Sequence, residues 1–251
     1  MFTKFIEAFR LLCQNFRLFA AIIFTVWVPG NLLVNFISYN LPEVSESFLM
    51  RLPMMIETVF GPLYFGALVY ALYQIKSGNP VSYREAMSIG LQKWGSLFLA
   101  RFVAGFLTML GLIAFIVPGL MLAVRYSLLD AAVIVEGKGA RDSRVRSTEL
   151  TKGRRWPIFW SALLFLILFF SMSFALYLGF ALVPLLDNMF AGTLLDCFLD
   201  LVFAIIQIVL FLFYWEATEG QRQAEADLSM HGDLNGHGET LQLSEGSRSM
   251  S

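Results

Sequence analysis

Long apolar runs alternate with short polar segments along most of the chain, and this pattern predicts its architecture. Six of the runs are long enough to cross a bilayer, because about twenty apolar residues in a helix span the hydrocarbon core. We therefore expect an all-α integral membrane domain over residues 1–215 with six transmembrane helices. The predicted spans are 18–39, 54–75, 97–117, 120–136, 157–183 and 197–215.

The third and fourth runs meet without a charged residue between them, and together they are too long for one span. Pro118 and Gly119 are therefore expected to make a tight turn at the outer face. The alternative is one long kinked helix followed by a re-entrant segment that is buried in protein. In the first run, Asn31 and Asn35 lie one helical turn apart, and this polar stripe should face other helices.

Residues 216–251 are polar, acidic and rich in Gly and Ser, so we expect a disordered cytoplasmic tail. The rest of the composition agrees with a membrane domain, since 57% of residues are hydrophobic, mean hydropathy is +0.67 and only 15% are charged. A net charge of −1 gives no reason to expect a nucleic-acid partner.

The distribution of basic residues predicts the orientation. Fifteen of the eighteen Lys and Arg residues fall on the side of the N-terminus, Arg51 falls on the other side, and Arg101 and Arg125 lie within spans. Because basic loops stay in the cytoplasm, both termini should be cytoplasmic.

The segments that precede the first, third and fifth spans resemble one another when they are aligned on Phe16, Trp94 and Trp156. This similarity predicts three repeated units, each an amphipathic cytoplasmic helix followed by a transmembrane hairpin, in a pseudo-threefold arrangement. The alternative is that any helix entering a membrane shows a similar order of residues.

Four charged residues are expected inside the membrane. We predict that Glu57 pairs with Arg125, because an unpaired guanidinium at this depth would cost several kcal/mol. Arg101 is placed to reach Asp130. Each pair is interpreted as a structural salt bridge, and the alternatives are a gate or anion site at Arg125 and a proton relay at Asp130.

The loop between the fourth and fifth spans holds seven basic residues, and such clusters next to a span attract anionic lipid headgroups. The alternative is that the cluster only retains the loop in the cytoplasm. The candidate headgroup ligands are Lys138, Arg141, Arg144, Arg146, Lys152, Arg154 and Arg155.

The sequence contains no pattern typical of an enzyme. Its two histidines lie in the tail, and its two cysteines, Cys13 and Cys197, are predicted at opposite faces of the membrane. We expect no catalytic residue, no metal ligand and no cofactor.

Three stretches carry a resemblance to a known family: Ile116–Tyr126 (IVPGLMLAVRY), Val133–Ala140 (VIVEGKGA) and Arg146–Trp156 (RSTELTKGRRW). They resemble the YciC-like bacterial six-span membrane proteins and the membrane domain attached to some glycerophosphoryl diester phosphodiesterases. The resemblance implies the six-span layout and no reaction, because catalysis in the fused members belongs to a separate soluble barrel.

Two hypotheses follow. The first is a non-enzymatic cytoplasmic-membrane protein that interacts with anionic lipid, with a membrane-protein partner or with a second copy of itself. The second is a small permease or transport-accessory subunit, with a polar path lined by Glu57, Arg101, Arg125 and Asp130.

Overall fold

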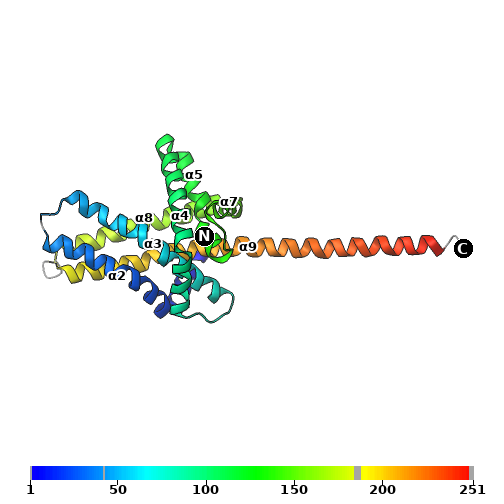
Figure 1. The fold of residues 1–251 in the computed structure, drawn as a ribbon, viewed down its shortest axis with the longest axis horizontal. Helices are drawn as coiled ribbons and strands as arrows, with labels where there is room; N and C mark the ends of the chain where they lie inside the picture. The colour runs from blue at the N-terminus through cyan, green and yellow to red at the C-terminus, as the bar shows by residue number, and fades with distance from the viewer. Residues whose placement is uncertain (1, 42, 184–187, 249–251) are drawn as a thin grey trace. The chain divides into compact units, whose positions relative to one another are not determined.

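The computed structural model describes residues 2–41, 43–183 and 188–248, with side chains described as far as residue 223. These residues form helices and no strand (Figure 1). The helices are α1 (Phe2–Gln14), α2 (Phe16–Asn40), α3 (Glu46–Lys76), α4 (Tyr83–Ala114), α5 (Ile116–Tyr126), α6 (Leu129–Val135), α7 (Ala140–Leu150), α8 (Arg155–Ala181) and α9 (Met189–Arg248).

The predicted six-span, all-α architecture is confirmed. Six helical segments are long and apolar enough to cross a membrane: α2, α3, α4, α5 together with α6, α8, and residues 189–223 of α9. Three spans begin well before the predicted residue: α3 begins at Glu46 rather than near residue 54, α4 at Tyr83 rather than near 97, and α9 at Met189 rather than near 197. Residues 184–187, between the predicted fifth and sixth spans, lie outside the described residues.

The predicted turn at Pro118 and Gly119 is wrong by a few residues. The chain reverses at Phe115, whose backbone is extended, and Pro118 lies in the first turn of α5. A proline fits there because the first amides of a helix have no carbonyl partner within the helix. The resulting α4–α5 hairpin excludes the alternative of one long kinked helix. Figure 1 shows its turn end projecting away from the other helices, while the first part of α4 packs along α3.

Gly119 is the residue that lets this hairpin close. A Cβ atom at this position would lie 2.4 Å from Cγ of Leu112 and 2.5 Å from its backbone nitrogen. Carbon atoms do not approach so closely, so any larger residue would push α5 away from α4.

The fourth span is broken between α5 and α6, at Ser127 and Leu128. The backbone groups released by the break are bound by Ser147 of α7, whose hydroxyl donates to the carbonyl of Arg125 at 2.6 Å. The same hydroxyl accepts a hydrogen bond from the amide of Leu128 at 3.2 Å. Ser147 is fully buried, and it fixes α7 beside the break.

The order of the predicted repeat is visible in the structure, although its pseudo-threefold packing stays a prediction. Separate helices, α1 and α7, precede the first and last hairpins. The equivalent segment of the middle unit is instead continuous with its span, because α4 runs without interruption from Tyr83, where the Ser82 side chain caps it.

The structure describes α9 as helical to Arg248, and the disorder expected for residues 216–251 stays a prediction. Extending an existing helix needs no new nucleus, and Glu, Gln, Ala and Arg all have good helix propensity. Residues 214–251 form a unit of their own, separate from residues 1–213.

Ser147→Ala is expected to lower the free energy of unfolding by about 2 kcal/mol, because it leaves a buried amide and a buried carbonyl without partners. Thermal unfolding in detergent would measure the loss. Ser143→Ala is the matched control: Ser143 is equally buried on α7, but its hydroxyl bonds only to the carbonyl of Ala140 in the same helix. Equal losses in the two variants would contradict this role of Ser147.

Gly119→Ala is expected to destabilise the protein by about 1–3 kcal/mol through overpacking of the hairpin. Gly95→Ala is its control, since a Cβ atom there meets nothing within 4 Å and alanine favours helix by up to about 1 kcal/mol. Melting temperatures should fall for the first variant and stay level or rise for the second. If Gly119→Ala did not lower the melting temperature, the hairpin would not be closed as described.

Candidate functional site

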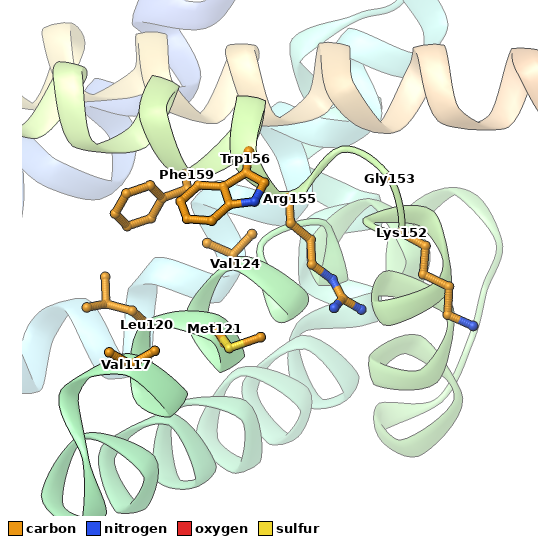
Figure 2. Close-up of a pocket in the computed structure, with 9 residues that line it drawn as sticks. All are labelled: Val117, Leu120, Met121, Val124, Lys152, Gly153, Arg155, Trp156 and Phe159. Atoms are coloured by element: carbon orange, nitrogen blue, oxygen red, sulfur yellow. The ribbon is translucent and has the colours of Figure 1, made fainter.

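A groove of about 750 Å³ lies where α5 meets the junction between α7 and α8. Figure 2 shows its side chains, with the apolar residues of α5 facing the aromatic residues at the start of α8 and the two basic residues gathered at one end. It is lined by Val117, Leu120, Met121, Val124, Lys152, Gly153, Arg155, Trp156 and Phe159.

The apolar part of the groove is open rather than filled by the protein. Val117 is 68% exposed, Met121 is 47% exposed and Trp156 is 70% exposed. In a membrane protein such residues lie against acyl chains, and tryptophan favours the boundary between acyl chains and headgroups. The groove therefore offers an apolar surface of the kind that accepts a lipid chain.

The basic end is built by the short connection that follows α7. Gly153 has a φ of +77°, a backbone conformation that glycine adopts without strain, and it turns the chain into α8. This turn places Lys152 and Arg155 on the same groove. Nε of Arg155 is buried without a hydrogen-bond partner in the described part of the chain, so this guanidinium has a donor to offer.

The structure separates the seven candidate headgroup ligands into different settings. Arg146 donates from Nε to both carboxylate oxygens of Glu136 at 2.9 Å, and Lys138 lies 3.6 Å from the same carboxylate. Arg144 donates to the carbonyl of Ala140. Two of the seven, Lys152 and Arg155, line the groove, and Arg141 and Arg154 do not.

The predicted ion pair between Glu57 and Arg125 is wrong, because no ion pair or hydrogen bond joins them among the described residues. Arg125 lies in the last turn of α5, where its carbonyl is bound by Ser147, so it sits beside α7. Glu57 instead lines a cavity of about 390 Å³ together with Arg101. The early reversal at Phe115 also places Arg125 farther along the hairpin from the turn than the sequence predicts.

The predicted contact between Arg101 and Asp130 is confirmed. Nη1 of Arg101 lies 2.8 Å from Oδ2 of Asp130, in the first turn of α6. The guanidinium carbon also lies 3.7 Å from the centre of the Phe65 ring, a cation–π contact. The pair holds α4 against α6, while the second carboxylate oxygen of Asp130 is buried without a hydrogen-bond partner within the described ranges.

A second group of polar side chains within the spans was not predicted from the sequence. Asn31 donates to Asp200 at 2.7 Å and Asn35 donates to Asp196 at 2.7 Å, which joins α2 to α9. The expectation that the two asparagines face another helix is confirmed. The sequence does contain a pattern that indicates their partners, because Asp196 and Asp200 share the four-residue spacing of Asn31 and Asn35.

Breaking the Arg101–Asp130 pair from one side should destabilise the protein by roughly 3 kcal/mol, because the remaining charge loses its partner. Asp130→Asn and Arg101→Met test each side, and the double variant completes a thermodynamic cycle. The double variant should lose much less stability than the sum of the single losses. Additive losses, measured by unfolding in detergent, would show that the two charges are not coupled.

Comparison with known proteins agrees with a membrane protein. No family model and no solved structure matches the chain. Over 152 residues the chain is 29% identical to a UPF0259 membrane protein of Sodalis glossinidius (strain morsitans), and the match covers 61% of this chain and 59% of that protein. The YciC-like assignment and the link to the phosphodiesterase membrane domain stay predictions. With six apolar helices and this likeness, the chain is a membrane protein consistent with a bacterial membrane family.

Proposed function

We propose that this protein is a non-enzymatic component of the bacterial cytoplasmic membrane, with both termini in the cytoplasm, and that it binds an anionic lipid in the groove between α5 and α8. The observation that carries the proposal is the combination of an open apolar wall and two basic side chains in one groove. An anionic phospholipid has the complementary parts: a negatively charged phosphate followed by apolar acyl chains.

The fit can be stated for each part of the lipid. A phosphate beside Lys152 and Arg155 would gain charge-assisted hydrogen bonds from these two side chains. An acyl chain would lie along Val117 and Met121, where the wall is exposed. The exposed ring of Trp156 lies between these two regions, at the level where tryptophan is favoured.

The arrangement supports lipid binding better than the two alternatives. If the basic loop served only to retain itself in the cytoplasm, its charges would need no defined apolar neighbour. The polar path of a permease would need its four residues to be connected, and Arg125 lines neither of the cavities that Arg101 lines. The experiment described next also distinguishes lipid from a protein partner or a second copy of the chain at the same groove.

Native mass spectrometry of the purified chain tests the proposal. Phosphatidylglycerol should remain bound in preference to zwitterionic phosphatidylethanolamine. Neutralising the groove with Lys152→Gln and Arg155→Gln should weaken phosphatidylglycerol binding roughly thirtyfold, from about 1 kcal/mol for each basic residue.

The matched control carries Arg141→Gln and Arg144→Gln, which remove the same charge from the same loop outside the groove. It should retain most of the binding. Equal losses of phosphatidylglycerol binding in the two double variants would mean diffuse electrostatic attraction rather than a site. Retention of a protein instead of lipid would identify that protein as the partner.

A further inference from the structure

A second cavity, of about 630 Å³, lies among α2, α3, α8 and α9 and shares no residue with the groove. Its size is within the range of small-molecule sites, roughly 300–1,000 Å³. Two features set it apart from a gap between apolar helices: an aromatic wall and a pair of carboxylates.

The aromatic wall comes mainly from α8. Four of its rings line the cavity on successive turns, and a fifth ring comes from α2. Ring faces carry partial negative charge and attract cations. The five aromatic residues are Trp27, Phe169, Phe170, Phe174 and Tyr177.

The two carboxylates belong to Asp196 and Asp200 of α9. Their partners are neutral: Asn35 and the Tyr177 hydroxyl bind Asp196, and Asn31 binds Asp200. No basic residue is among the residues that line this cavity. The setting differs from that of Asp130 and Glu136, each of which has an arginine within 2.9 Å.

Two hydroxyls in the same region also lack partners. The Tyr64 side chain is only 1% exposed, and its hydroxyl has no hydrogen-bond partner in the described chain. Its ring packs edge-on against Trp27 of the cavity wall. Ser173, which lines the cavity, has a buried hydroxyl without a partner as well. Buried hydroxyls are normally bonded, so the Ser173 hydroxyl is a polar group of the cavity lining that an occupant would satisfy.

We propose that this cavity binds a lipophilic organic cation, such as a quaternary ammonium or phosphonium compound. Asp200 and Asp196 supply the opposite charge, and the aromatic wall supplies cation–π contacts and apolar surface. A bulky cation suits this wall better than a bare metal ion, which requires several oxygen ligands around it. A membrane carboxylate without a cationic partner is costly, and a bound cation removes that cost.

Binding of tetraphenylphosphonium to the purified full chain in detergent, followed by calorimetry, tests the proposal. Tetraphenylborate is the matched probe, since it has the same shape and the opposite charge. The cation should bind saturably and at least tenfold more tightly than the anion. Asp200→Asn, which keeps the shape of the side chain, should weaken cation binding by tenfold or more.

Phe174→Ala is a second variant, chosen because Phe174 is 73% exposed and its loss should not prevent folding. It should also weaken cation binding. Glu43→Gln, an equal change of charge at an exposed residue outside the cavity, should have no effect, and neither should the neutralised lipid groove. Equal binding of the two probes, or cation binding unchanged by both Asp200→Asn and Phe174→Ala, would overturn the proposal.

Discussion

The need to satisfy buried backbone groups controls much of this structure. The break between α5 and α6 releases a carbonyl at Arg125 and an amide at Leu128, and burial against α7 removes water as a partner. Ser147 binds both groups and so fixes α7 against the break. Because the chain enters α8 directly after α7, the same contact determines where Lys152, Arg155 and Trp156 meet α5. The position of the groove thus follows from the hydrogen bonds that Ser147 makes to the broken span.

Two settings of charge can be distinguished in the described part of the chain. The first kind is compensated: Arg101 with Asp130 and Arg146 with Glu136 are ion pairs that join neighbouring elements. The second kind has only neutral partners, and Asp196 and Asp200 are its members. Compensated pairs are sufficiently explained by packing. Carboxylates held by amides beside an aromatic cavity have the chemistry of a binding site, which is why they carry the further inference.

The two proposed sites differ in charge as well as in place. The groove presents basic side chains to an anionic headgroup, and the second cavity presents carboxylates to a cation. Both combine a charged end with a large apolar wall, so both would select amphiphilic molecules that are already dissolved in the bilayer. This shared property agrees with a chain in which six described helical segments are long and apolar enough to cross a membrane.

Residue patterns along the chain were enough to determine the helical class, the six spans, the contact of Arg101 with Asp130 and the polar face of α2. These features depend on hydrophobic periodicity and on the cost of burying charge, which act locally. Only the tertiary structure decided that the hairpin turns at Phe115, that Arg125 lies beside α7 rather than near Glu57, and that Asp196 and Asp200 face Asn35 and Asn31. Such pairings depend on the depth and rotation of each helix, and these are set by close contacts such as Gly119 against Leu112, which join residues through space.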